Sequence, residues 1–194
     1  MTYKIILASG SPRRKELLAG LGYDFEIRLI SGIDESYPEG LSGEQIAEYI
    51  AHEKATPYRD TMAQDELVIT ADTIVYLEGK VLGKPKDEDE ACAMLRSLSG
   101  KTHQVITGVT LLTKDSSKTF SSTSNVTFAT LSDDEIDHYV THYKPLDKAG
   151  AYGIQEWIGI VGVERIEGSY FNVMGLPIQR LYTELKAYLD KPLQ

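Results

Sequence analysis

The sequence predicts an α/β protein in which a mixed sheet carries helices on its faces. Two observations support this fold class, and a third concerns the number of domains. Apolar runs with strand periodicity alternate with helix-capping patterns along the chain, which indicates βα units. Short turns such as EGK and KDSS join neighbouring apolar runs, which indicates hairpins and excludes a purely parallel sheet. Because no linker-like stretch interrupts these patterns, residues 1–194 are expected to form a single domain.

The N-terminal half begins with a strand that runs directly into a helix. Pro12 suits a first helical position, and Gly20 and Gly22 end that helix. Ser42 and Gln45 have capping-box spacing at the start of a second helix. The expected elements are a strand at Tyr3–Leu7, a helix from Pro12 to about Ala19, a strand at Asp24–Ile30, a helix opened by Ser42 and reaching about Ala55, and a hairpin of Glu66–Leu77 with Val81–Leu82.

The C-terminal half repeats these signals. Asp87 with Glu90, and Ser132 with Glu135, have the spacing of helix caps. The expected elements are a helix from Asp87 that Gly100 stops, a hairpin of Thr102–Leu112 with Thr119–Thr130, a helix from Ser132 to about Tyr143, a glycine-bearing loop KPLDKAGAYGIQ, strands within Trp157–Arg165 and Tyr170–Val173, and a last helix from Pro177 to Leu189.

The composition limits the classes of partner. The chain has 29 acidic and 20 basic residues and a net charge of −9, which repels nucleic acid and membrane surfaces. A nucleotide ligand would therefore need locally placed cations and a divalent metal. No run approaches the roughly 20 apolar residues of a membrane span, and Cys92 is the single cysteine, so a cytoplasmic protein without disulfides is expected.

The turn ASGSPRRK has the features of an anion site. Ser9 and Ser11 lie where a strand meets a helix, whose first backbone N–H groups lack helical partners. Arg13 and Arg14 fall in the first helical turn, where the helix dipole disfavours cations, so their placement favours a bound anion. The alternative is that both arginines pair with surface carboxylates. The spacing matches neither G-x-G-x-x-G nor a Walker loop.

Asp72 is the strongest catalytic candidate. It follows the apolar run Leu67–Ala71, which is typical of a buried central strand. A buried carboxylate costs several kcal/mol unless it is paired or bound to metal, so Asp72 is expected to act as a general base or a metal ligand. The alternative is a strand-end Asp that bonds a neighbouring backbone group. Thr73 is expected to face the opposite side of the strand.

Further charged residues complete the candidate site. Glu35 supplies a second carboxylate, and Mg²⁺ needs only one or two protein carboxylates besides phosphate oxygens and water. Glu35 and Asp72 are therefore the candidate metal ligands, although an acidic loop residue such as Glu35 is commonly only solvated. Lys54 continues the apolar stripe of its helix, so it either snorkels or reaches into a site. Lys84 follows the hairpin that carries Asp72.

Several segments in this order resemble the Maf family of nucleoside triphosphate pyrophosphatases over essentially the whole chain. They are LASGSPRRKELL, ADTIV, GKP, THQVITGV, LDKAGAYGIQ and GSYFNVMGLPI. The resemblance implies a fold similar to that of inosine triphosphate pyrophosphatases, with a curved sheet and two lobes around a nucleotide cleft, and a homodimer. It also implies Mg²⁺- or Mn²⁺-dependent release of pyrophosphate and a nucleoside monophosphate.

The resemblance also assigns roles to individual residues. Asp72 matches the proton acceptor of the family, and Glu35, Lys54, Lys84 and Gln155 match other active-site positions. The set Arg13, Thr73 and Gln155 matches the branch that acts on dTTP and UTP, which implies removal of surplus or modified pyrimidine nucleotides from the nucleotide pool. Two alternatives are a pyrophosphatase for a modified purine nucleotide and a nucleotide-binding regulator of septum formation in cell division.

Overall fold

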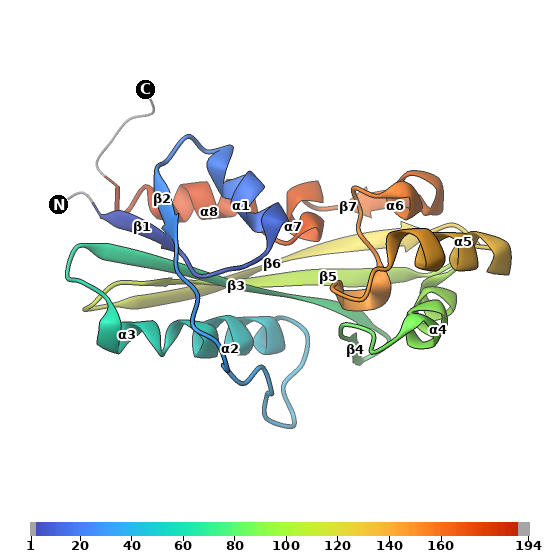
Figure 1. Cartoon of the computed structure of the whole chain (residues 1–194), viewed down its shortest axis with the longest axis horizontal. Coiled ribbons are helices and arrows are strands. Elements are labelled where there is room, and N and C mark those ends of the chain that lie inside the picture. Colours follow the sequence, from blue (N-terminus) through green and yellow to red (C-terminus); the bar gives the residue numbers. More distant parts are fainter. Residues whose placement is uncertain (1–2, 190–194) are drawn as a thin grey trace. The chain divides into compact units, whose positions relative to one another are not determined.

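The computed structural model describes residues 3–189, and these residues form a mixed sheet with helices on it, as the sequence predicts (Figure 1). The strand order is β2-β1-β3-β5-β6-β7, with β4 paired to β3. Strand β1 is parallel to β2 and β3, whereas β3–β4 and β6–β7 are antiparallel. The strands are β1 Lys4–Leu7, β2 Phe25–Ile27, β3 Glu66–Leu77, β4 Lys80–Leu82, β5 Thr102–Leu112, β6 Ser117–Phe128 and β7 Val163–Glu167.

The helices begin close to the predicted caps. Asp87 accepts a hydrogen bond from Glu90 N, and Ser132 with Glu135 forms a complete capping box. Gly43 caps α2 in place of Ser42, whose backbone N–H bonds the Gln45 side chain. The helices are α1 Pro12–Ala19, α2 Glu44–Ala55, α3 Tyr58–Thr61, α4 Glu88–Leu98, α5 Asp133–Tyr143, α6 Trp157–Gly162, α7 Tyr170–Met174 and α8 Ile178–Leu185, with a 3-10 turn η1 at Ala149–Ala151. Within residues 3–189, no helix is both long and apolar enough to cross a membrane.

The prediction of two strands near the C-terminus is wrong in part. Only Val163–Glu167 is a strand, and helix α6 occupies the apolar run before it. Gly159 allows α6 to pack tightly, because an added Cβ would lie 1.9 Å from the Ile154 carbonyl oxygen. A short apolar run does not distinguish a strand from a buried helix, which explains the error.

The segment predicted as a strand at Tyr170–Val173 is helix α7. The Ser169 hydroxyl accepts the Asn172 backbone N–H at 3.3 Å, as a helix cap does. The Asn172 side chain is fully buried and donates to the Val105 carbonyl at 3.0 Å. These polar contacts, which hydrophobic periodicity does not reveal, stabilise a helical turn in place of a strand.

The described chain divides into two compact units. The first contains residues 3–72, 107–122 and 175–189, and the second contains residues 73–106 and 123–174. Strands β3, β5 and β6 therefore contribute residues to both units. The single domain expected from the sequence stays a prediction.

In the first unit, helix α2 lies directly against the strands. An added Cβ at Gly108 of β5 would lie 2.2 Å from the Ala47 carbonyl oxygen, so the backbones of α2 and β5 meet there. The Thr70 hydroxyl of β3 donates to the Ala51 carbonyl at 2.6 Å, which holds the same helix one turn further on. Figure 1 shows α2 on one side of these strands and α8 on the other.

Alternating side chains of β6 explain why both helices pack on it. The Ser121 hydroxyl donates to Glu48 of α2 at 2.6 Å. The neighbouring Phe120 points to the opposite face, where the Arg180 guanidinium of α8 lies 5.2 Å from its ring centre. Helices α2 and α8 therefore cover opposite faces of the strand in the first unit.

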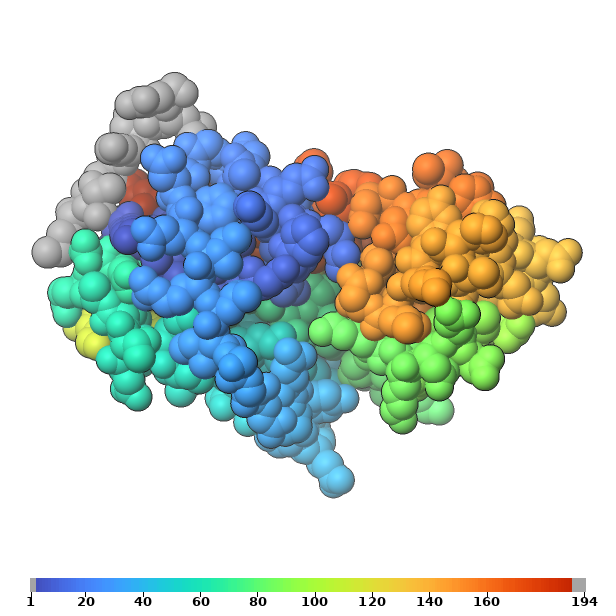
Figure 2. All heavy atoms as spheres, viewed as in Figure 1, coloured from blue at the N-terminus to red at the C-terminus, as the bar shows by residue number. Residues whose placement is uncertain are grey.

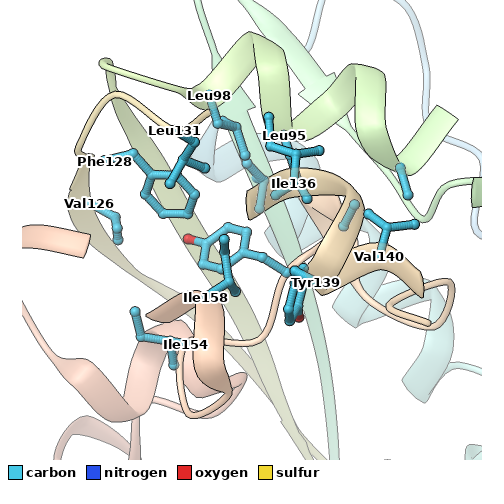
Figure 3. Close-up of a cluster of buried hydrophobic side chains, with 14 of the residues drawn as sticks. Leu95, Leu98, Val126, Phe128, Leu131, Ile136, Tyr139, Val140, Ile154 and Ile158 are labelled. Atoms are coloured by element: carbon cyan, nitrogen blue, oxygen red, sulfur yellow. The ribbon is translucent and has the colours of Figure 1, made fainter. Parts of the chain in front are cut away.

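The second unit has its own apolar core around helices α4 and α5 (Figure 3). Leu95 and Leu98 of α4 lie beside Ile136 and Tyr139 of α5 in this cluster, and all four side chains are almost fully buried. The core also includes residues of β6, of the segment that leads into α6 and of α6 itself, namely Val126, Phe128, Ile154 and Ile158. The loop before α6 is thereby packed, through Ile154, against the apolar core of the second unit.

We expect Gly108→Ala to destabilise the protein by about 2 kcal/mol or more, because the new methyl group would overlap the Ala47 carbonyl. Urea unfolding of the natural chain and the variant measures the difference. Gly83→Ala is the matched control, since an added Cβ there meets nothing within 4 Å. Equal losses in both variants would contradict the backbone contact between α2 and β5.

Candidate active site

The turn between β1 and α1 has the strand–turn–helix geometry that the sequence predicts. Ser11 is the N-cap of α1, and its hydroxyl accepts the Arg14 backbone N–H at 3.5 Å. Ser9 is buried, and its hydroxyl accepts the Ser11 N–H at 3.3 Å. Pro12 occupies the first helical turn and no acidic residue does. The turn therefore presents the positive end of a helix dipole without a local carboxylate to cancel it.

The Arg14 guanidinium connects this turn to two other segments of the first unit. Its Nε donates to the Gly175 carbonyl at 2.7 Å, and its Nη1 donates to the Ala71 carbonyl at 2.8 Å. Burial lowers the pKa of Arg14, while the charge of Asp72 raises it. Arg14 thus links the N-terminal turn to the backbone at Ala71, next to Asp72, and at Gly175. Its contact with phosphate stays a prediction.

The sequence assigns no role to the two carbonyl groups that accept hydrogen bonds from Arg14. Every residue has a backbone carbonyl, so the side chains of Ala71 and Gly175 do not indicate that their carbonyl oxygens accept hydrogen bonds from Arg14. The one indirect signal is Gly175 itself, whose φ of 118° is a conformation that favours glycine. That conformation places the Gly175 carbonyl against Arg14.

A charged cluster surrounds Asp72. The Lys54 ammonium lies 2.6 Å from Asp72 Oδ1 and 3.0 Å from Glu35 Oε1. The side chains of Lys54 and Asp72 are only 16% and 13% exposed, so this ion pair is largely shielded from water. Lys54 therefore contacts two carboxylates and does not extend its ammonium into solvent, whereas its role in a functional site stays a prediction.

Asp72 lies in the interior of β3, which continues to Leu77, so the alternative of a strand-end Asp does not apply. Its carboxylate bonds a side chain from α2, which the Gly108 and Thr70 contacts hold against the strands. Glu35 comes from the connection of residues 28–43 between β2 and α2, which runs along the surface of the first unit (Figure 2). Three separate segments thus bring Glu35, Lys54 and Asp72 together.

The connection that carries Glu35 is anchored near its start. The Tyr58 hydroxyl donates to the Arg28 carbonyl at 2.8 Å and accepts the Ile30 N–H at 3.1 Å. The Arg28 guanidinium forms a two-bond ion pair with Glu66, at 2.6 and 2.8 Å. This pairing lowers the pKa of Glu66 to about 2. Strand β3 therefore holds both Asp72 and the start of the segment that leads to Glu35.

The two carboxylates fit an incomplete metal site. No group of three or more His, Cys, Asp or Glu within residues 3–189 is arranged to hold a metal ion. Glu35 and Asp72 nevertheless share one cationic neighbour, so their oxygens converge on a position that already favours positive charge. This donor set suits Mg²⁺ or Mn²⁺ if substrate phosphate and water complete the coordination.

Arg13 is half-buried in the first turn of α1, in the first unit, whereas the other three candidate residues belong to the second unit. Lys84 and Gln155 are exposed, and Thr73 is half-buried directly after Asp72 in β3. The loops that carry Lys84 and Gln155 are connected, because the Gly150 N–H donates to the Gly83 carbonyl at 3.0 Å. The second unit thus holds these two predicted site residues on loops that touch each other.

A buried histidine stabilises the loop that carries Gln155. His103 Nε2 and the Tyr152 hydroxyl are 2.7 Å apart, and both rings pack edge-on against Phe128. Burial lowers the pKa of His103 to about 4, so the ring is neutral at pH 7. Burial likewise raises the pKa of Tyr152.

The fold and the site define an α/β protein in which a helix N-terminal turn lies in the same unit as a shielded carboxylate–lysine cluster. Residues 4–188 match the family of Maf-like proteins, and the chain belongs to that family.

Curated relatives cover nearly the whole chain. The chain is 66% identical over 184 residues to a protein of Phocaeicola vulgatus and 61% identical over 184 residues to one of Bacteroides fragilis, each match covering 95% of both proteins. Both relatives are named dTTP/UTP pyrophosphatase. A solved nucleoside-triphosphatase/dITP/XTP pyrophosphatase of Mycobacterium abscessus aligns with 97% of this chain and 100% of its own, at 15% identity and a TM-score of 0.43.

We expect the free energy of unfolding of the natural chain to fall as the pH falls from about 6.5 to about 4. In this range His103 is protonated in the unfolded chain but stays neutral in the folded protein, where burial lowers its pKa. His103→Gln should lack this loss, which is on the order of 3 kcal/mol. Urea unfolding across this pH range measures it. His52→Gln, at an exposed position of α2, is the control. An unchanged pH dependence in His103→Gln would refute this role of the histidine.

Proposed function

We propose that this chain hydrolyses nucleoside triphosphates to the nucleoside monophosphate and pyrophosphate, with dTTP and UTP as substrates. The observation that carries the proposal is the contact of the largely buried Lys54 ammonium with both Asp72, also largely buried, and the half-exposed Glu35. Relatives at 66% and 61% identity that are named dTTP/UTP pyrophosphatase support the same reaction and the same bases.

Asp72 acts as the general base in this proposal. A carboxylate in the interior of a strand cannot relax far from its position, and Lys54 holds one of its oxygens at 2.6 Å. Asp72 accepts a proton from the water that attacks the α–β phosphoanhydride. The ammonium of Lys54 offsets part of the negative charge of Asp72 and Glu35, so an anionic substrate meets less repulsion there.

Cations and helix dipoles stabilise the phosphates. The N-terminal turn of α1 offers backbone N–H groups and Arg13, and Lys54 adds a shielded positive charge. Such fixed groups stabilise charge that develops on the leaving pyrophosphate. Lys84 is proposed to contribute in the same way from the second unit. Local cations are necessary because the protein as a whole carries a charge of −9.

Glu35 and Asp72 are proposed to hold a divalent cation, Mg²⁺ or Mn²⁺. When bound, such an ion neutralises phosphate charge and helps to orient the triphosphate. Lys54 then has to share its two carboxylate partners with the ion. In this proposal Asp72 acts as a metal ligand, as the general base, or as both.

Recognition of the base is proposed to involve Arg13, Thr73 and Gln155. The amide of Gln155 has both a donor and an acceptor, which match the N–H and C=O edge of uracil and thymine. The side chain of Gln155 is exposed, so a ligand can reach it. Removal of surplus or modified pyrimidine nucleotides, a cytoplasmic location and a homodimer complete the proposal.

The reaction is tested by incubating the purified protein with a panel of nucleotides, with and without Mg²⁺ or Mn²⁺, and identifying the products. We expect monophosphate and pyrophosphate from dTTP and UTP, and no turnover after chelation of the metal. Turnover restricted to purine nucleotides would favour the modified-purine alternative. Diphosphate with phosphate as products, or binding without turnover, would reject the proposed reaction.

We expect Asp72→Asn to lower turnover of dTTP at least about 100-fold while the fold persists, because the amide cannot accept the proton. The melting temperature and the far-UV spectrum report on the fold. Asp60→Asn, at an exposed position of α3, is the matched control and should keep normal turnover. Near-normal turnover in Asp72→Asn would refute the assignment of the base.

A further inference from the structure

A second shielded charge cluster lies in the loop that precedes α6. The Lys148 ammonium is 2.7 Å from Asp147 Oδ1 and 3.1 Å from Glu156 Oε1. The Lys148 side chain is only 9% exposed, so it is held within the second unit. The cluster therefore ties the start of the loop to its end.

Tyr139 of α5 adds two hydrogen bonds to this cluster. Its hydroxyl donates to Glu156 Oε2 and accepts the Gly153 N–H at 3.0 Å. The ring is fully buried in the apolar core of the second unit, which also contains Ile154 and Ile158 (Figure 3). Burial raises the pKa of Tyr139, so the hydroxyl keeps its proton and remains a donor at neutral pH. A rigid helix thus holds the loop at two points.

The loop has little room to move. An added Cβ at Gly153 would lie 2.8 Å from the Glu156 carboxyl carbon, and one at Gly150 would lie 2.8 Å from a Val75 methyl group. The intervening Tyr152 is also held, through its hydroxyl, by His103. The backbone between Gly150 and Glu156 is therefore fixed by close packing as well as by hydrogen bonds.

Gln155 is the exposed residue in this fixed stretch. Ile154 before it is buried in the core, and Glu156 after it is held by Tyr139 and Lys148. Both peptide units that flank Gln155 are thus restrained, while its own side chain faces solvent. This arrangement limits the positions that the amide of Gln155 can reach.

We propose that Tyr139, Glu156 and Lys148 are positioning residues that hold Gln155 in place to recognise a pyrimidine base. This inference rests on the proposed function, in which Gln155 contacts the base. An amide that must match a donor and an acceptor gains affinity when its backbone is already fixed.

Stability alone does not explain the cluster. Burying charges is expensive, and apolar residues of similar volume often stabilise a core as well or better. The charged network instead fixes one geometry, because each hydrogen bond has a preferred direction. Fixed geometry at Gln155 is what selective contact with one type of base requires.

A double-mutant cycle tests whether Tyr139 acts through Gln155. The steady-state rates of dTTP hydrolysis are measured for the natural chain, Tyr139→Phe, Gln155→Ala and the double variant. We expect Tyr139→Phe alone to raise KM about tenfold with kcat within about twofold, the effect of losing well-placed hydrogen bonds to the loop. In the Gln155→Ala background the same change should raise KM less than about twofold.

Other outcomes overturn the inference. An equal rise in KM in both backgrounds would show a structural effect that does not pass through Gln155, and an unchanged KM in Tyr139→Phe would show that the network is not needed. If Gln155→Ala keeps the natural KM, its proposed contact with the base is wrong and the inference fails with it. Absence of dTTP and UTP turnover in the natural chain would instead refute the proposed function.

Two further variants make the test robust. Tyr143→Phe is the matched control, because Tyr143 lies one turn further along α5, stacks on Tyr139 and is 41% exposed. It should leave KM and kcat unchanged. If Tyr139→Phe fails to fold, Glu156→Gln replaces it in the cycle, since the amide keeps an acceptor for Tyr139 but loses the ion pair with Lys148. The same non-additive result is then expected, with a rise in KM of about threefold.

Discussion

The close contact between helix α2 and strand β5 is the constraint on which the first unit depends. At Gly108 the two backbones approach so closely that no side chain fits, and one turn later Thr70 bonds the carbonyl of Ala51. Helix α2 therefore has one position and one rotation relative to the strands. Lys54, a turn beyond Ala51 on the same helix, reaches Asp72 because of that placement. The candidate catalytic cluster is thus a consequence of backbone packing.

Each unit contains a shielded lysine that contacts two carboxylates. Lys54 contacts Asp72 and Glu35, and Lys148 contacts Asp147 and Glu156. Burying an ammonium group is costly, and each lysine is stabilised by its pairing with two carboxylates, of which Glu35 and Asp147 remain more than half exposed. In the first unit, the cluster supplies the proposed general base and a cation for the substrate phosphates. In the second unit it orders a loop. The same electrostatic arrangement therefore supports two different tasks.

Much of the fold could be predicted from local signals. Helix α1 has the predicted bounds, and the capping box of Ser132 with Glu135 is present as expected. These predictions succeed because caps and turns act over a few residues. The predictions at α6 and α7 fail because apolar runs of this length fit either a strand or a helix, and distant contacts decide between them. One such contact joins Asn172 to the Val105 carbonyl, 67 residues away in the sequence.

The sequence by itself determined the residue types of the candidate site: a serine-rich turn with two arginines, an aspartate in an apolar strand, and a lysine on the packed side of a helix. These signals are local, since an anion site or a buried carboxylate is unusual wherever it occurs. Only the tertiary structure decided which groups meet. Backbone carbonyls bond Arg14, one ammonium joins Asp72 to Glu35, and a helix hydroxyl orders the loop of Gln155. Such contacts join segments tens of residues apart, and no local pattern encodes them.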